Sequence, residues 1–206
     1  MKKTTLIIGI AFLSASLFNS TISKAQEVEH GKSVVTLGGG ASLAGIVFTA
    51  FKDIVNATGT VTSHSTPVLI GNYDYSVAQK FSIGVAYSYQ SVSVNYSSYK
   101  KDTATINGDF KDVLSRQNFG VRPLFHFGSG DNSDGYFGAR ISYTIWKYTS
   151  NVRNDVNLTS NSLFNNRLHV QALIGGRYFF TDNIGVNLEF AIGPSYYAMG
   201  GLNIRF

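Results

Sequence analysis

Cysteine is absent from the 206-residue chain, which excludes disulfide bridges, thiolate metal sites, a cysteine nucleophile and a lipid-modified N-terminal cysteine. Charge is also scarce, because charged residues make up 14% of the sequence, against about 25% in an ordinary soluble domain. The net charge of +5 falls by three, to +2, once Lys2, Lys3 and Lys24 of the first segment are removed. Nucleic acid is therefore not an expected partner.

Long apolar runs are missing beyond the first segment, which has the pattern of a secretory signal peptide. A charged start at Met1–Lys3 precedes a mostly apolar run at Leu6–Phe18 and the small-x-small site Ser23–Ala25. The run is shorter than the ~20 residues of a spanning helix, which disfavours a membrane anchor. We predict a signal peptide over residues 1–25 and a single mature domain over residues 26–206.

Most of the remaining chain alternates apolar and polar residues with period two, the pattern of strands with one apolar face. From Phe81 to Tyr89, for example, every second residue is apolar. Five segments show this pattern clearly, at about 81–90, 118–127, 137–145, 168–180 and 184–192. Three weaker segments bring the total to eight strands, at 33–43, 68–77 and 197–206.

The connections between these strands alternate in length. Long segments at about 44–66, 96–112 and 151–163 alternate with short ones at 78–80, 128–134 and 181–183, and only the last outer loop, near Pro194, is short. Outer-membrane barrels have long outer loops and short periplasmic turns, and aromatic residues flank the short turns here as they do in an interfacial girdle. The sequence predicts an all-β, eight-stranded antiparallel transmembrane up-and-down β-barrel with both termini in the periplasm.

The last strand carries the most specific motif, in which Gly201, Ile204 and the terminal Phe206 have the spacing of a barrel assembly signal. With this motif the chain resembles the small OmpA/OmpX-type outer-membrane β-barrel family over essentially the whole mature sequence. The resemblance implies a bacterial outer-membrane location, contact with lipid, and recognition of Phe206 by the barrel-assembly machinery.

If the apolar face points to lipid, the polar residues must fill the lumen, which in an eight-stranded barrel is only wide enough for side chains. An open water pore is therefore not expected. Buried charges persist when they are paired, so we expect Glu189 to pair with arginines. The expected interior network is structural and comprises Arg122, Arg140, Arg177, Asn187, Glu189 and Arg205.

No catalytic, metal or cofactor site is predicted. Small barrels that resemble lipid A deacylases have a serine two residues after the histidine, but Gly128 occupies that position after His126. His169 has inward parity near serines of the preceding loop, which is not enough to define a nucleophile and base. The four histidines are dispersed without the paired spacing of metal ligands.

Two features depart from a simple barrel. Pro123 lies inside a clear strand and lacks the N–H of a ladder bond, so we expect a bulge near the periplasmic rim. The first outer connection contains Leu43, Val47, Phe51 and Val55 at helical i, i+4 spacing, which indicates a short helix at the barrel mouth or in the lipid interface.

We interpret the chain as a monomeric, non-enzymatic outer-membrane protein with a structural role, or one of interaction with an extracellular ligand through its long loops. A conduit for small hydrophobic solutes, as in barrels that resemble the OmpW type, is the principal alternative. A lipid-modifying barrel enzyme is another. A soluble lipocalin-like barrel would have a charged exterior, and the low charge of this chain disfavours it.

Overall fold

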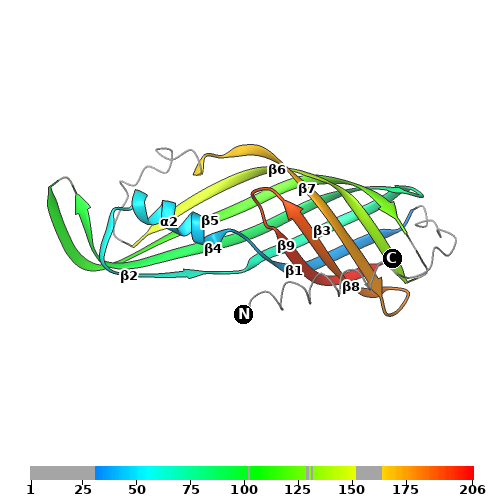
Figure 1. The fold of residues 1–206 in the computed structure, drawn as a ribbon, viewed down its shortest axis with the longest axis horizontal. Coiled ribbons are helices and arrows are strands. Elements are labelled where there is room, and N and C mark those ends of the chain that lie inside the picture. The colour runs from blue at the N-terminus through cyan, green and yellow to red at the C-terminus, as the bar shows by residue number, and fades with distance from the viewer. Residues whose placement is uncertain (1–30, 102, 129, 131, 152–163) are drawn as a thin grey trace, which may run out of the picture.

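The computed structural model describes residues 31–101, 103–128, 130, 132–151 and 164–206. It is a closed antiparallel barrel of eight strands, in which each barrel strand pairs with the next barrel strand along the chain and the first pairs with the last (Figure 1). This confirms the predicted eight-stranded transmembrane β-barrel. The barrel strands are β1 (Ser33–Ala41), β3 (Val68–Ala78), β4 (Phe81–Lys101), β5 (Ala104–Phe127), β6 (Ser133–Ser150), β7 (Arg167–Phe179), β8 (Ile184–Ile192) and β9 (Ala198–Arg205).

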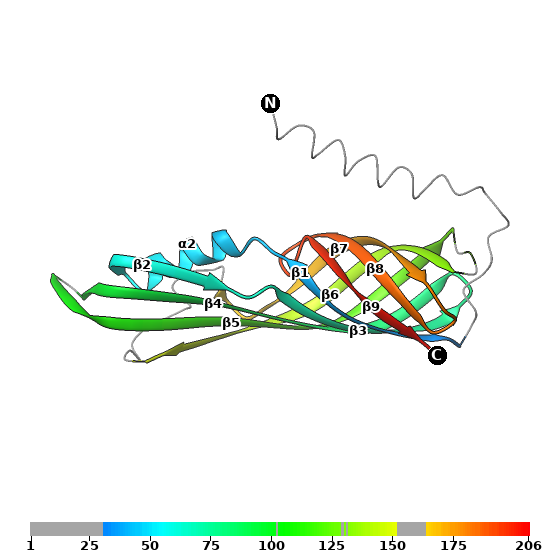
Figure 2. The same cartoon turned by 90° about the horizontal axis from the view of Figure 1, so that it is seen from below.

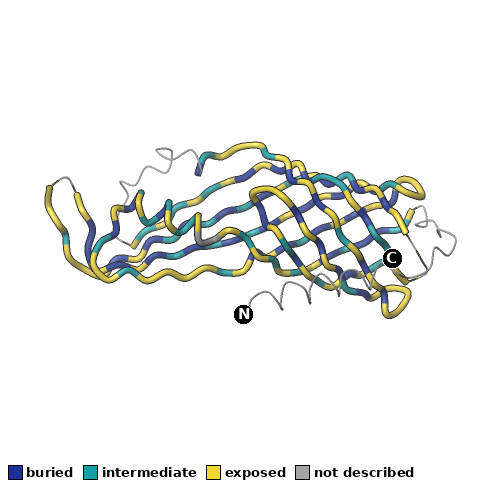
Figure 3. Tube along the Cα trace, viewed as in Figure 1, coloured by how far each residue is buried: buried dark blue, intermediate teal, exposed yellow. Residues whose placement is uncertain are grey.

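The outer surface of the barrel is apolar, as the alternation predicts. Large hydrophobic side chains are strongly exposed along every strand, among them Leu37 at 63%, Leu188 at 51% and Leu202 at 62%. Residues of the opposite parity are buried in the lumen, so exposed and buried positions alternate along the chain trace (Figure 3). Such a surface suits lipid and not water.

The second strand of the barrel is continued by an additional short strand. Strand β2 (Ala57–Ser65) pairs with the outer half of β4, and β3 pairs with the inner half of the same strand. Thr66 and Pro67 separate the two segments, and the Thr66 hydroxyl accepts a hydrogen bond from the Ser91 backbone N–H at 3.0 Å. We did not predict β2, because its threonines and serines look like those of a polar loop.

Four strands continue well beyond the barrel as a sheet that we call the extension, built from β2 and the outer parts of β4, β5 and β6 (Figures 1 and 2). The prediction of a loop at 96–112 is wrong, because β4 runs to Lys101 and β5 begins at Ala104. The predicted helix is present as α2 (Ala44–Ile54), which packs on one face of the extension. No helix in the described part of the chain is long and apolar enough to cross a membrane.

The predicted bulge at Pro123 is also wrong. Pro123 pairs in register with Ile83 of β4. On its other side the β5–β6 ladder is interrupted at Arg122 and Pro123 and resumes at Leu124 in the same register. The barrel therefore tolerates the missing N–H as a local gap in one ladder, without an inserted residue.

Candidate functional site

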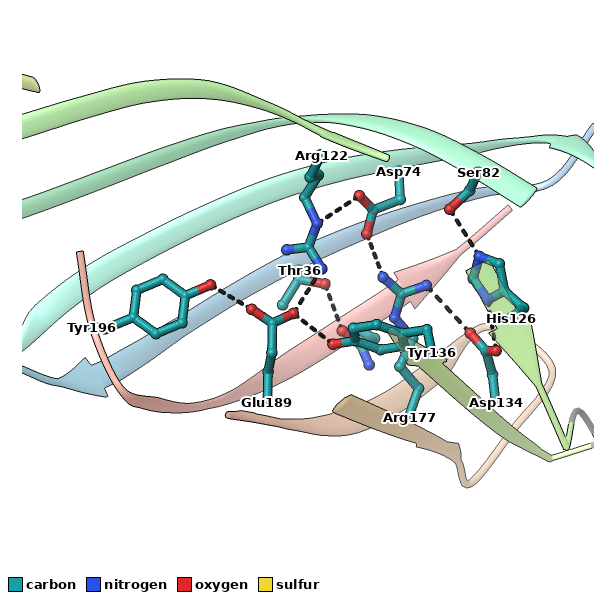
Figure 4. A network of polar contacts seen from close by, with 11 residues as sticks. Thr36, Asp74, Ser82, Arg122, His126, Asp134, Tyr136, Arg177, Glu189 and Tyr196 are labelled. Carbon is teal, nitrogen blue, oxygen red and sulfur yellow. Dashed lines mark hydrogen bonds and ion pairs between the residues drawn. The ribbon is translucent and has the colours of Figure 1, made fainter. Parts of the chain in front are cut away.

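The centre of the lumen holds an ion network whose members come from four strands (Figure 4). Arg122 on β5 donates from Nη2 to Glu189 Oε2 on β8 at 2.7 Å, and its Nε lies 3.1 Å from Asp74 Oδ1 on β3. The other oxygen of Asp74 is paired with Arg177 on β7. All four side chains are at most 2% exposed, so these charges are held by one another and not by water.

Two tyrosines complete the coordination of Glu189. The Tyr136 hydroxyl donates to Oε2 at 2.8 Å, and the Tyr196 hydroxyl donates to Oε1. The Arg177 guanidinium also lies over the Tyr136 ring, with its carbon 4.7 Å from the ring centroid. Glu189 thus accepts one charge-assisted bond and two hydroxyl bonds, which offset the desolvation of its carboxylate.

The network continues to the barrel end that carries the short turns. Asp134 lies 3.4 Å from Arg177 and accepts a hydrogen bond from His126 Nδ1 at 2.7 Å, while His126 Nε2 lies 2.8 Å from the Ser82 hydroxyl (Figure 4). Since a carboxylate only accepts, Nδ1 carries the proton. The order serine, histidine, aspartate is that of a catalytic triad. Ser82 is only 1% exposed, however, so its hydroxyl is enclosed by the barrel.

At the opposite end of the lumen the β8–β9 loop folds inward. Arg116 donates to the carbonyl oxygens of Pro194 and of Ser195, the latter at 2.6 Å, and Gln171 donates to the Tyr196 carbonyl at 2.5 Å. Ser195 and Tyr196 are 0% and 1% exposed. His169 bonds the Ser195 hydroxyl at 3.2 Å, so side chains of two strands, β5 and β7, anchor the loop across this end of the lumen.

The structure brings together only some of the predicted interior residues. Arg122, Arg177 and Glu189 share the central network, and Asn187 is buried in the lumen. Three expected members, Asn187, Arg140 and Arg205, are not in it, and the Asn187 Oδ1 has no partner among the described residues. Arg140 is buried without a hydrogen-bond partner for its guanidinium, and Arg205 lies at the rim, where its Nε donates to the Asp182 carbonyl.

Sequence reasoning missed the partners that complete the network. Asp74 has the inward parity of a predicted strand, which was the available signal. Asp134 falls in a segment that we predicted as a turn, but β6 begins one residue before it. Tyr136 and Tyr196 look like girdle or loop aromatics, and only the closed barrel brings their hydroxyls to Glu189.

The extension is a second candidate site, because it has a hydrophobic core of its own. Helix α2 covers the sheet so that Phe51 and Val55 are fully buried, and Phe51 meets Phe164 edge to face at 6.4 Å. The buried members of this extension core are Phe51, Val55, Ala57, Val94, Tyr96, Tyr99, Phe110, Leu114 and Phe164. No group of three potential metal ligands occurs among the described residues.

The apolar exterior, the closed strand order and the filled lumen define an integral β-barrel of the bacterial outer membrane. The family model of the Opacity family porin proteins matches residues 83–204, and the chain belongs to that family. None of the curated proteins compared with the sequence matches it.

Similar solved structures are also outer-membrane barrels. The N-terminal β-barrel domain of Pseudomonas aeruginosa OprF is 14% identical, with 86% of this chain and 98% of that chain covered and a TM-score of 0.44. P. aeruginosa OprG is 11% identical, with 89% and 99% covered and a TM-score of 0.47. Yersinia pestis Ail, in complex with the heparin analogue sucrose octasulfate, is 8% identical, with 86% and 100% covered and a TM-score of 0.45.

Proposed function

We propose that this protein is a surface-interaction protein, in which the barrel is a closed membrane anchor and the extension binds a ligand outside the cell. The observation that carries the proposal is the core of the extension, which folds the sheet into a rigid platform beyond the membrane. A simple loop would not need a helix that contributes to a nine-residue aromatic and aliphatic core. Functional groups are commonly displayed on such supported outer segments.

The contents of the lumen support an anchor in preference to a conduit or an enzyme. Paired charges fill its centre, and the β8–β9 loop is bonded across its outer end. Passage of a solute would require several buried ion pairs and hydrogen bonds to break. The enclosed hydroxyl of Ser82 likewise supports a non-enzymatic role.

The proposal includes an orientation and a route to the membrane. The C-terminus lies at the barrel end remote from the extension (Figure 1), so an extracellular extension places both ends of the barrel chain in the periplasm. Residues 1–25, which lie outside the described residues, direct export. Gly201, Ile204 and Phe206 then direct recognition by the barrel-assembly machinery, and Ile204 and Phe206 are 50% and 62% exposed.

We further propose that the protein acts as a monomer in the membrane. Strands β1 and β9 pair over eight residues, from Val34↔Arg205 to Ala41↔Ala198, so the ring of strands is closed. A closed barrel presents no strand edge within the lipid to a second copy.

The binding surface that fits the extension is the open edge of β2. Within the described part of the chain β2 pairs with β4 alone, and it contains no lysine, arginine, acid or proline to block its edge. The Thr66 N–H bonds to the Ser91 carbonyl, so in this antiparallel ladder the N–H groups of Val61, Ser63 and Ser65 face the open edge. An extended peptide segment of a protein ligand would add here as a further strand.

Adhesion of intact bacteria tests this function. Cells that display the protein are compared with cells lacking it for binding to immobilised fibronectin, laminin and collagen, with Ser63→Pro as the variant and Ser63→Ala as its control. We expect binding to at least one of these proteins, its loss in Ser63→Pro and its retention in Ser63→Ala. Equal adhesion of cells with and without the protein would contradict a surface-interaction role.

A further inference from the structure

Arg140 is a buried cation without a hydrogen-bond partner. It is 0% exposed on the lumen side of β6, and none of its three side-chain nitrogens lies in good hydrogen-bond geometry to another described residue, with the Tyr196 side chain as its nearest polar neighbour. Its guanidinium lies over the Tyr196 ring, with the carbon 5.5 Å from the centroid. A ring face attracts a cation, but it does not satisfy N–H donors, and unsatisfied buried donors are strongly destabilising.

The nearby carboxylates are already committed to other groups. Glu189 accepts from Arg122, Tyr136 and Tyr196, and Asp74 is shared between Arg122 and Arg177. Asp134 is engaged by Arg177 and His126. Asp112, the remaining buried carboxylate, accepts from Tyr96 in the extension core, four residues along β5 from Arg116 and so about 13 Å away.

A second cation of the lumen lacks a carboxylate as well. Arg116 donates only to the neutral oxygens of Pro194, Ser195 and Gln90, and its Nε has no partner among the described residues. Arg116 and Arg140 both approach the same short segment, Pro194 to Tyr196. Four lumen guanidiniums therefore face three lumen carboxylates, and the excess positive charge lies beneath the β8–β9 loop.

Other free polar atoms lie on the same inward face. The Ser142 hydroxyl, two residues along β6 from Arg140, is 0% exposed and has no partner among the described residues. Gln171 lies opposite Arg140 in the strand pairing, and its Oε1 has no partner among the described residues. This neutral oxygen can accept one N–H of the Arg140 guanidinium, but it does not neutralise the positive charge. The Arg140 guanidinium therefore lacks a negatively charged partner, although neutral polar groups lie beside it.

We propose that the lumen binds a small inorganic anion of the halide class beneath the β8–β9 loop, held by the Arg140 guanidinium and the Ser142 hydroxyl. A monatomic anion fits because an eight-stranded barrel has room for little beyond its own side chains. The loop, which Arg116 and Gln171 anchor, covers the anion from outside. The anion is thus a structural ligand that neutralises Arg140 and binds only the folded barrel.

Thermal unfolding of the full-length purified protein in dodecyl maltoside tests the site. A ligand that binds only the folded state raises Tm with its concentration. We expect a higher Tm in sodium chloride or bromide than in sodium isethionate at equal ionic strength, with a saturable dependence on halide. Arg140→Gln removes this dependence, whereas Arg205→Gln, at the rim, retains it. Equal Tm in chloride and isethionate, or full halide dependence in Arg140→Gln, would overturn the proposal.

Bromide in crystals of the wild-type protein gives a test that does not depend on folding of a variant. The expected result is an anomalous peak within hydrogen-bond distance of the Arg140 guanidinium. Water at that position without anomalous signal, or bromide confined to surface sites, would overturn the proposal.

Discussion

The barrel and the extension share strands, but their apolar side chains lie on opposite faces of those strands. Along β4 the residues from Phe81 to Tyr89 place apolar side chains outward, whereas Val92, Val94 and Tyr96 place them inward. The same reversal occurs along β6, where Ile145 faces outward and Trp146 packs against the inner core. A period-two pattern that changes parity within one continuous strand therefore marks where the surrounding solvent changes from lipid to water.

The two regions are consequently held together by different forces. The barrel has lipid outside, and inside it has an ion network with tyrosine hydroxyls beside a smaller group of buried apolar side chains, so its interior depends strongly on the pairing of charges. The extension has an apolar core under a helix and a polar outer face, as in a water-soluble sheet. Substitutions of the same kind should have different consequences in the two regions.

The largest effect is expected inside the barrel. Glu189→Ala leaves Arg122 buried without one of its two carboxylates and removes the acceptor of both tyrosine hydroxyls. Removal of one member of a buried ion pair costs about 3–5 kcal/mol. We expect a loss of that order in the free energy of unfolding, measured by urea titration in lipid vesicles. Glu189→Gln, which keeps an acceptor oxygen, is the control and should lose less.

A core substitution in the extension should affect that region alone. Phe51→Ala removes a fully buried ring from the helix, and such truncations cost about 3–5 kcal/mol. We expect protease added to intact cells to cleave the extension faster, while the heat-dependent gel shift of the barrel remains. Ile46→Ala, at a position 58% exposed on the same helix, is the control. Loss of the gel shift in Phe51→Ala would show that the two regions do not fold independently.

The lipid face gives the next smaller effect. Leu188→Arg places a charge on the outward side of β8 and should cost about 2–4 kcal/mol if it lies near the bilayer midplane. Val113→Arg, on the outward face of β5 in the extension, should be nearly neutral. Urea unfolding in vesicles measures both. A neutral Leu188→Arg combined with a severe Asn187→Leu would reverse the assignment of inside and outside.

The fold was predictable because alternate residues of a barrel strand face lipid and the lumen, so apolar and polar residues alternate in the sequence. The eight strands follow from alternation in segments such as 81–90 and 184–192. The extension was not predicted, because the polar residues at 96–112 are typical of a loop. Tyr96 and Phe110 face each other in the core, and Tyr99 joins them only through the register shift between Tyr96 and Ser98, which a strict period of two does not reveal.

The sequence predicted which charged residues of the candidate site face the lumen, but it did not predict which of them pair with one another. Inward parity predicted Arg122, Arg177 and Glu189 as interior groups. It could not show that Arg177 meets Asp74, 103 residues away, because closure and stagger of the whole ring decide which inward side chains face each other. For the same reason Arg140, of identical parity, is left without a carboxylate.

The smallest effect is expected near the tip of the β4–β5 hairpin. Asn107 is exposed and pairs with Ser98, next to the Tyr99↔Ile106 pair at the end of the aromatic cluster. Surface changes away from packed groups usually stay within about 0.5 kcal/mol, so Asn107→Ala should leave unfolding and the protease pattern unchanged although the position lies in a strand. A marked increase in cleavage of Asn107→Ala cells would mean that order in the extension depends on its ladder to the tip, and not on the helix-covered core alone.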